Sequence, residues 1–309
     1  MLTVKNYLYV IPVIAFLASV PAWSSQFLID ALVIYLLYLS AAEVWGFMAK
    51  NAGLVSLGQQ IFIGVGGYTT AVITMYYGVA MWSSVLISSL IGAGLAAVLA
   101  FPLLRMRGMY FSISTFLAAE VIKLFFNSWE FVGAGKGLIF REAYGVSTSI
   151  TYYAALAVAI STVFLLYYLY NLKIGFGLRS VGCDEDAASS VGVNTFRLKA
   201  LMFIIASAII SVIGAINAVN RTYLHPTSAF SIAWTVDFVF IAVIGGMGRL
   251  MGPVMGCAIF LTLRYMFAQY LGLSLLLEGI VVFALLLASP EGLWGLISRR
   301  IKIKPPPPI

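Results

Sequence analysis

Residues 81–101 read MWSSVLISSLIGAGLAAVLAF, a run without a single charged side chain. A hydrocarbon core about 30 Å thick is crossed by roughly 20 apolar residues in an α-helix. The run is continuously apolar, whereas a strand of a membrane barrel alternates in polarity over about ten residues. This stretch therefore predicts one transmembrane helix.

Comparable apolar runs recur along the whole chain. Of its 309 residues, 62% are hydrophobic and 9% are charged, whereas soluble globular chains carry roughly 25% charged residues. We predict an all-α integral membrane protein, a polytopic helical bundle of about ten transmembrane helices, some of them broken, that forms one domain over residues 1–309. The ten expected spans are Tyr7–Val20, Leu28–Ala49, Leu54–Tyr77, Met81–Phe101, Met109–Phe126, Tyr152–Tyr170, Ala200–Val219, Ile232–Ile244, Pro253–Leu271 and Ser274–Ala288.

The two ends and the order of the spans carry further signals. The stretch Asn6–Val20 is also similar to the apolar core of a secretory signal peptide, but nothing in the charge pattern demands cleavage. The tail Ile301–Ile309 contains a Pro305–Pro308 run, which cannot be helical, and we expect it to be disordered. Spans one to five run from inside to outside overall and spans six to ten run back, which fits an inverted-topology repeat. An ordinary ten-helix bundle fits the same pattern.

The positive charges predict how the chain sits in a cell membrane. The net charge of +7 comes from Lys and Arg scattered at the ends of spans, and these do not form the patch that binding to nucleic acid requires. Ten spans place both termini on one side, and a cytoplasmic location for them satisfies the positive-inside rule. The cytoplasmic positives are then Lys5, Lys50, Arg105, Arg107, Lys173, Arg179, Arg197, Lys199, Arg249, Arg299, Arg300, Lys302 and Lys304, and the outside ones are Lys136, Arg141 and Arg221.

The densest charge lies in the cytoplasmic connection 172–199. Within it, residues 182–192 predict a short helix outside the membrane: Asp184 can cap its N-terminus, Glu185 and Asp186 suit its positive end, and Gly192 can end it. Ala187 and Ala188, with the two serines that follow, leave a flank able to lie close to another protein. A solvated loop helix without a partner fits these residues as well.

Two polar, glycine-rich stretches interrupt the apolar runs and predict broken helices. Broken helices at membrane depth expose backbone groups that can hold the carboxylate and ammonium of a substrate. Close helix packing through small residues explains the glycines equally well. The residues expected along a substrate pathway are Ser56, Gln59, Gln60, Gly64, Gly66, Gly67, Gly245, Gly246 and Gly248, together with Glu43 in the preceding span.

Charged residues inside membrane spans are costly and are therefore functional candidates. Glu120 and Lys123 are three positions apart on one helix and are expected to pair. Arg264 and Glu278 reach similar depth in an antiparallel hairpin and are expected to form a structural pair. Glu43 has no evident partner.

No motif for nucleotide or metal chemistry is found. Gly135-Lys136-Gly137 lacks the first glycine and the hydroxyl residue of a P-loop, and the single histidine, His225, has no second metal ligand in prospect. We expect no catalytic residue, no metal site and no cofactor bound by this chain.

Four stretches between about Ile29 and Leu296 resemble one family, the permease subunits of branched-chain amino acid ABC importers, and specifically the longer, M-like permease of the pair. Residues 53–68 resemble the family pattern G-x-x-S-L-G-x-x-x-F-x-G-x-G-A-Y. Residues 101–111 resemble L-R-L-R-G-x-Y-F. Residues 184–194 resemble the coupling segment D-E-x-A-A-x-x-x-G-x-N, and residues 243–253 resemble V-x-G-G-x-G-S-x-x-G-P.

The resemblance implies a transport subunit that pairs with a homologous permease, two ATP-binding subunits and an extracytoplasmic substrate-binding protein. ATP and Mg²⁺ would be used by the partner ATPases, which would push on a coupling helix formed by Asp184, Glu185, Asp186, Ala187, Ala188, Gly192 and Asn194. Ser189 stands where the family usually has Glu, and Arg249 replaces a common Ser. Because Ser189 replaces a Glu, the docking surface would carry one negative charge fewer than is usual in the family, and the complementary charge expected on its partner is in doubt.

The leading hypothesis is an importer of branched-chain or other neutral amino acids. Related importers carry urea, short amides or sugars, so the cargo stays open. The polar third span and Glu43 leave a second alternative, an ion-coupled secondary transporter that acts alone. A membrane-embedded enzyme ranks last, because no His, Asp and Glu residues gather at a shared depth.

Overall fold

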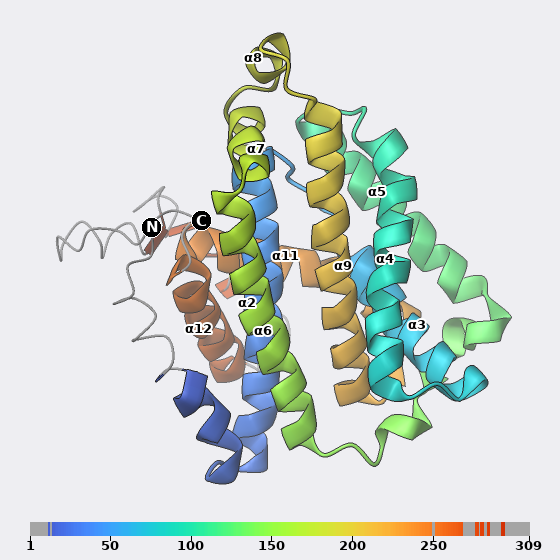
Figure 1. Cartoon of the computed structure of the whole chain (residues 1–309). Helices are drawn as coiled ribbons and strands as arrows, with labels where there is room; N and C mark the ends of the chain where they lie inside the picture. Colours follow the sequence, from blue (N-terminus) through green and yellow to red (C-terminus); the bar gives the residue numbers. More distant parts are fainter. Residues whose placement is uncertain are drawn as a thin grey trace.

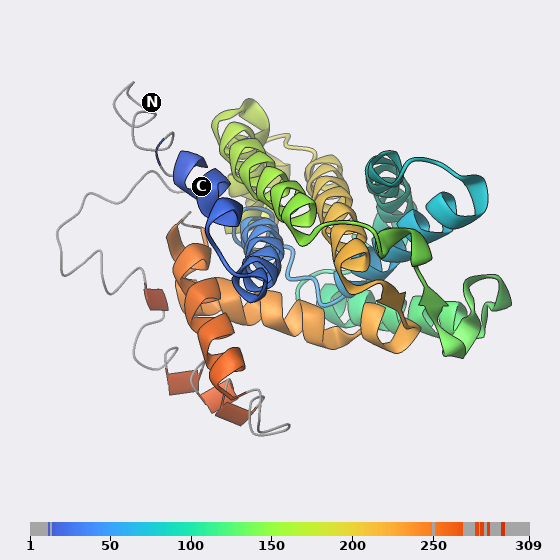
Figure 2. The same ribbon diagram turned by 90° about the horizontal axis from the view of Figure 1, so that it is seen from below.

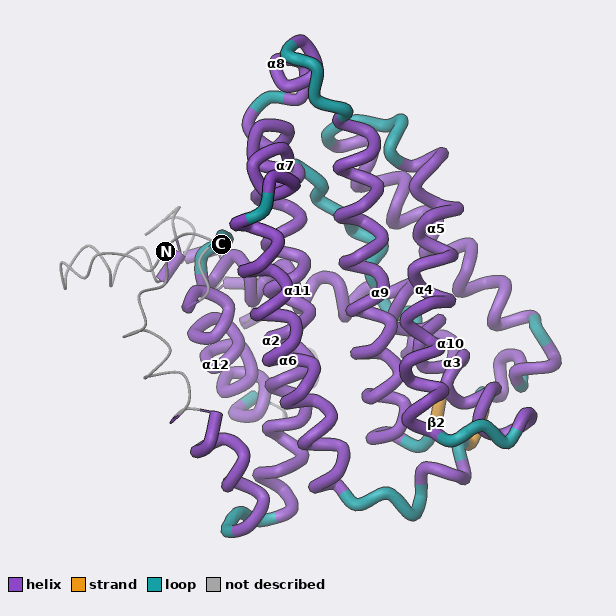
Figure 3. Tube along the Cα trace, in the orientation of Figure 1, coloured by secondary structure: helices purple, strands orange, loops and turns teal. Residues whose placement is uncertain are grey.

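The computed structural model describes residue 12, residues 14–248 and 251–267, and the pairs 276–277, 279–280, 283–284 and 292–293. Almost all of this part is helical (Figure 1, Figure 3). The α-helices are α2 (Gln26–Ala52), α3 (Gln60–Tyr77), α4 (Met81–Leu103), α5 (Met109–Ser128), α6 (Thr148–Asn171), α7 (Lys173–Cys183), α8 (Glu185–Ser190), α9 (Thr195–Arg221), α10 (Pro226–Ala229), α11 (Ile232–Gly245) and α12 (Met251–Met266). Short 3-10 turns are η1 (Val20–Ala22), η2 (Glu130–Val132), η3 (Ala134–Lys136) and η4 (Arg141–Ala143), and β1 (Leu138–Ile139) pairs antiparallel with β2 (Tyr223–Leu224).

Six helical segments of the described part are long and apolar enough to cross a bilayer, and α12 is a shorter apolar helix. The six are Gln26–Ala52, Met81–Leu103, Met109–Ser128, Thr148–Asn171, Thr195–Arg221 and Pro226–Gly245. This confirms a polytopic α-helical membrane protein. The expected span Tyr7–Val20 lies partly outside the described residues, Ser274–Ala288 lies largely outside them, and the expected tail 301–309 lies wholly outside them.

The centre of the bundle is formed by α2, α3 and α9. Helix α9 packs against α3 and α4, and α2 packs against α6. The α3–α9 contact is close because a Cβ at Gly66 would overlap the carbonyl of Ser211, and one at Gly214 would overlap the carbonyl of Ile63. Viewed from below, α11 runs crosswise to the long helices α2, α6 and α9 (Figure 2). Glycines on both helices thus allow the backbones of α3 and α9 to approach closely.

The third expected span is wrong at its start. The prediction began this span at Leu54 and expected a break in its glycine-rich stretch. In the structure α2 ends at Ala52, Gly53 follows with a left-handed φ of 66°, and α3 runs from Gln60 to Tyr77. Residues 53–59 form an irregular link in which Leu54, Ser56, Gly58 and Gln59 are buried, whereas Gly53 and Val55 are exposed. Side chains satisfy its backbone: Ser112 Oγ donates to the Val55 carbonyl at 2.6 Å, and Trp45 Nε1 donates to the Ser56 carbonyl at 2.8 Å. Non-helical backbone is tolerated at membrane depth where protein groups satisfy its hydrogen bonds, as these two side chains do.

The second expected break is confirmed. Helix α11 ends at Gly245 and α12 begins at Met251. A Cβ at Gly245 would overlap the carbonyl of Gly252, so the two helix ends touch through their backbones. The glycines at this break therefore serve close packing as well as chain reversal.

Candidate functional sites

The short helix predicted outside the bundle exists as α8, which projects beyond the ends of the long helices (Figure 1). The Asp184 side chain caps it by accepting hydrogen bonds from the backbone N–H groups of Asp186 at 2.9 Å and Ala187 at 3.0 Å. Gly192 ends the helix at φ 89°. The Gly192 N–H donates to the Ser189 carbonyl, and the Val193 N–H donates to the Ala188 carbonyl. These two bonds form a Schellman motif.

Two cations hold the acidic start of α8 against the bundle. Glu185 forms an ion pair with Lys199, whose side chain is only 8% exposed, at the start of α9. Arg107, in the link between α4 and α5, donates to Asp186 Oδ1 at 2.7 Å and lies 3.9 Å from Glu185. The hydrogen bond to Asp186 and the charges of both carboxylates raise the pKa of the Arg107 guanidinium above its ordinary value. Ion pairs thus tie α8 to the link between α4 and α5 and to the start of α9.

The outer surface of α8 is free of contacts within the described chain. Ala187, Ser189 and Ser190 are exposed, Val191 is 80% exposed, and a Cβ at Gly192 would meet open space. Ala188 is buried against the protein itself. The expected small-residue flank is therefore made by Ala187 and the serines, and Ala188 serves internal packing. Asn194 caps α9 by accepting from the Arg197 N–H at 3.0 Å.

Helix α7 was not predicted, because the residues before Gly182 were assigned to the cytoplasmic connection 172–199 without secondary structure. It packs along α2, and its residues Leu178 and Val181 are buried. At its last turn, a Cβ on Gly182 would lie 2.6 Å from the carbonyl oxygen of Asn51. The end of α7, which leads into α8, is therefore seated on the end of α2.

The polar start of α3 lies in the core. Gln59 and Gln60 are completely buried, and Gln60 exchanges two bonds with Thr235 of α11: its N–H donates to Thr235 Oγ1 at 3.2 Å, and its side-chain oxygen accepts from that hydroxyl. Among the described residues, no hydrogen bond reaches Gln59 Oε1, Gln60 Nε2 or Glu43 Oε1. Ser56 is also buried, and its hydroxyl accepts from the Gly58 N–H.

The glycines of the expected pathway are packed tightly. A Cβ at Gly64 would overlap the ring of Phe230, and one at Gly67 would press on Leu224. Gly246 and Gly248 have left-handed φ values of 103° and 79°. A Cβ on Gly248 would lie 3.0 Å from Lys50 Cγ, so this cluster lies beside the end of α2 that carries α7. A pathway role for these residues stays a prediction.

The expected intramembrane pairs have different outcomes. Glu120 and Lys123 form an ion pair, as predicted. Arg264 Nη1 lies 2.6 Å from Asp237 Oδ2, a pair that the sequence analysis missed, and Glu278 lies outside the described residues. The signal for Asp237 was present, because an acid within an apolar run is a candidate by default.

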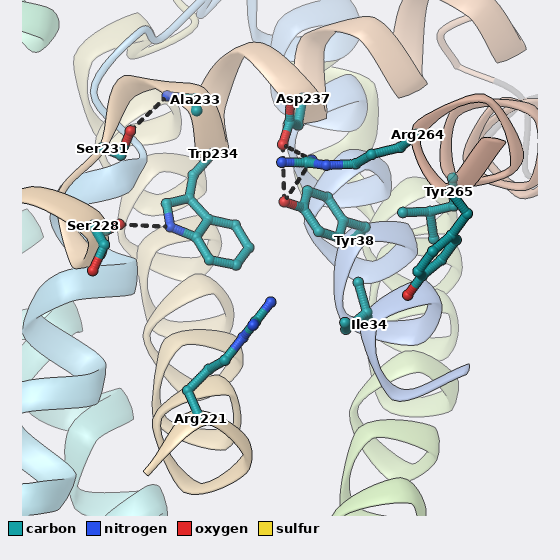
Figure 4. Close-up of a pocket in the computed structure, with 11 residues that line it drawn as sticks. Ile34, Tyr38, Arg221, Ser228, Ser231, Ala233, Trp234, Asp237, Arg264 and Tyr265 are labelled. Carbon is teal, nitrogen blue, oxygen red and sulfur yellow. Dashed lines mark hydrogen bonds and ion pairs between the residues drawn. The ribbon is translucent and has the colours of Figure 1, made fainter. Parts of the chain in front are cut away.

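The Arg264–Asp237 pair forms one wall of a pocket of about 530 Å³ between helices (Figure 4). Tyr38 completes a triad: its hydroxyl donates to Asp237 Oδ2 at 2.8 Å and accepts from Arg264 Nη1 at 3.3 Å. The Tyr38 ring stacks on Trp234 with ring centroids 5.2 Å apart. The pocket is lined by Ile34, Tyr38, Arg221, Ser228, Ser231, Ala233, Trp234, Asp237, Leu261, Arg264 and Tyr265.

The comparisons agree with this architecture. Residues 25–290 match the family described as branched-chain amino acid transport system, permease component. The chain is 24% identical to the high-affinity branched-chain amino acid transport system permease protein LivM of Salmonella typhimurium, over 98% of this chain and 78% of LivM. It is 22% identical to the nucleoside ABC transporter permease protein NupC of Lactococcus lactis, over 62% of this chain and 67% of NupC.

A putative glucose ABC transporter permease of Haloferax volcanii is 25% identical over 67% of this chain and 64% of that protein. No solved structure matches the chain. The family match covers most of the sequence, and the similarity to LivM extends along nearly all of it. The chain therefore belongs to the branched-chain amino acid transport system permease family and is a membrane permease subunit of an ABC importer.

Proposed function

We propose that this permease imports branched-chain or other neutral amino acids into the cytoplasm together with a homologous permease, two ATP-binding subunits and an extracytoplasmic substrate-binding protein. The observation that carries the proposal is α8. It is a capped helix that projects from the bundle, presents small exposed residues, and is tied by Glu185 and Asp186 to Lys199 and Arg107. Such a helix can serve as the surface on which an ATP-binding subunit docks and moves the membrane-spanning helices.

The proposal assigns ATP hydrolysis to the partners. Closure of two ATPases would move α8, and the contact of Gly182 with the end of α2 would pass that movement to the centre of the bundle. The chain itself supplies positions for binding and movement. The expected roles of Asp184, Glu185, Asp186, Ala187, Ala188, Gly192 and Asn194 in coupling belong to this proposal.

The sorting of charges supports a cytoplasmic location for α8. Gly182 lies against the backbone of Lys50, and Arg107 reaches Asp186, so these positive residues share one end of the molecule. At the other end, Tyr223 donates to the carbonyl of Lys136. In a cell membrane with the positive-rich end inside, both termini would be cytoplasmic if the full chain has ten spans, and the inverted repeat is a further part of this proposal.

Transport by the reconstituted complex tests the proposal. The permease is purified with its partner subunits, placed in liposomes, and offered radiolabelled leucine, uridine or glucose on the side of the binding protein. We expect leucine uptake that requires both ATP and the binding protein. Uptake of only uridine or glucose would overturn the amino acid assignment, and leucine uptake by the chain alone under an ion gradient without ATP would overturn the importer mechanism.

A further inference from the structure

The pocket that contains Arg264, Asp237 and Tyr38 also contains a second arginine, Arg221, at the last turn of α9 (Figure 4). The two arginines differ in their surroundings. Arg264 contacts Asp237, whose side chain is 3% exposed. Arg221 makes no ion pair or side-chain hydrogen bond to any residue that the structure describes, and it points into the space in front of Trp234. The pocket therefore offers a guanidinium that is available to a ligand.

We propose that this pocket, here named the Arg221 pocket, binds the zwitterionic end of an α-amino acid, with the carboxylate on Arg221 and the ammonium against Trp234 and the Tyr38–Asp237 pair. The inference rests on the proposed function and assigns a place to its cargo. A guanidinium presents a planar fork of N–H groups that matches the two oxygens of a carboxylate. Arg221 supplies that fork at one side of the cavity.

A place for the ammonium is offered by the rings of Trp234 and Tyr38, next to the Asp237 carboxylate that Arg264 and Tyr38 hold in position. The faces of Trp and Tyr rings attract cations, and both rings are held in position. Trp234 Nε1 donates to the Ser228 carbonyl at 3.1 Å, and the Tyr38 hydroxyl is bonded to Asp237. The site is thus ordered before a ligand arrives, which lowers the entropic cost of binding.

The remaining wall and the size of the cavity suit an aliphatic side chain. Ile34 and Leu261 contribute apolar surface to the same pocket. A volume of about 530 Å³ lies within the range of roughly 300–1,000 Å³ that is usual for small-molecule sites. One pocket therefore combines an anion position, a cation position and an apolar position.

The charge arrangement separates amino acids from the cargoes of other relatives. A nucleoside or a hexose carries no carboxylate, so its binding would cover Arg221 without replacing the water that solvates the guanidinium, which is unfavourable. The alternative is that Arg221 only complements the negative end of the α9 dipole. That role needs a positive charge at the helix end and has no effect on which cargo binds.

Equilibrium binding to the assembled importer in lipid nanodiscs, without the binding protein, distinguishes these roles. Radiolabelled leucine is competed with unlabelled leucine, with leucinamide, which lacks the carboxylate, and with 4-methylpentanoate, which lacks the ammonium. We expect Arg221→Gln to weaken leucine binding by about tenfold or more and to remove the preference for leucine over leucinamide. Leucine binding by Arg221→Gln equal to that of the unmutated protein would overturn the proposal.

Arg141→Gln is the matched control. Arg141 lies at the same end of the molecule, because the Phe140 N–H donates to the Thr222 carbonyl at 2.8 Å, and it does not line the pocket. We expect this variant to bind leucine normally. If Arg221→Gln fails to insert, Arg221→Lys keeps the charge at the helix end: a loss of about threefold or more at unchanged thermal stability supports the proposal, and no loss contradicts it.

The same preparation separates this inference from the proposed function. ATP hydrolysis stimulated by the loaded binding protein should persist in Arg221→Gln while leucine uptake falls. Normal uptake by Arg221→Gln would remove the pocket assignment and leave the importer intact. Absence of ATP-dependent leucine uptake by the unmutated complex would overturn the proposed function itself.

Discussion

Gly182 at the end of α7 lies against the backbone of Asn51 in the last turn of α2, with no room for a side chain between them. This contact joins the segment that carries α8 to a central helix of the bundle. Tyr38, which lines the Arg221 pocket, lies thirteen positions before Asn51 on α2, or about 20 Å along the axis at 1.5 Å per residue. One rigid helix thus connects the proposed docking end with the proposed cargo site.

Gly182→Ala should weaken that connection. The added Cβ would meet backbone atoms of Asn51, which cannot rotate away, so we expect a shift of α7 and a loss of about 1–3 kcal/mol of stability. Leucine uptake per ATP hydrolysed should fall in proteoliposomes. Gly177→Ala is the control, because its Cβ would meet only the Leu198 side chain, which can move. Equal uptake per ATP in the two variants would argue against transmission through this contact.

Gly192→Asp should leave the protein inserted and separate ATP hydrolysis from uptake. The residue has φ 89° in open space and closes the C-terminal cap of α8, so the change adds a charge to the docking surface. We expect uptake to fall about tenfold or more while the complex still hydrolyses ATP. Gly192→Asn tolerates the same backbone without the charge and should retain most activity. Normal uptake by Gly192→Asp would contradict a docking role for α8.

The Glu185–Lys199 pair should contribute to stability only as a pair. Glu185→Gln leaves the nearly buried Lys199 ammonium without its carboxylate, and we expect a cost of about 2 kcal/mol, which is reduced from a fully buried case because Glu185 is partly exposed. The double variant with Lys199→Met should lose less than the sum of the two single variants. Arg107→Gln, at a solvent-exposed ion pair, should leave the stability nearly unchanged. Denaturant unfolding in detergent measures all four, and strict additivity would disprove the coupling.

Thr235→Val should destabilise the start of α3. The Thr235 hydroxyl serves both the N–H and the side-chain oxygen of the completely buried Gln60, so its removal leaves buried polar groups unpaired at a cost of about 1–3 kcal/mol. Thr70→Val is the control, because Thr70 is equally buried and its hydroxyl has no partner among the described residues. Thermal unfolding should rank Thr235→Val well below Thr70→Val. The reverse order would show that the Gln60 network does not stabilise the fold.

The sequence alone predicted those features that depend on local patterns. The cap at Asp184, the stop at Gly192 and the apolar span 81–101 each follow from neighbouring residues, and each is present. The position of the irregular link 53–59 could not be predicted, because its polar backbone is satisfied by distant side chains such as Ser112 and Trp45. Those partners become visible only once the helices are packed.

The Arg221 pocket was beyond prediction for a related reason. Its residues come from α2, α9, α11, α12 and the segment around α10, and no spacing in the sequence indicates that Tyr38 meets Asp237. From the sequence, Arg221 indicates only the orientation of the chain in the membrane. Asp237, within a strongly apolar run, was not singled out as a candidate. Long-range packing, which periodicity does not encode, brings these side chains together.

Site-specific photo-crosslinking from α8 tests the central claim most directly. A photoreactive amino acid is placed at exposed Ala187 in the complete co-expressed importer, and at Tyr144, 67% exposed and on the segment next to the Arg141 control position, as a matched control. The account predicts a covalent product between position 187 and an ATP-binding subunit, and none from position 144. Absence of that product at position 187 in an importer that transports leucine with ATP would contradict the account.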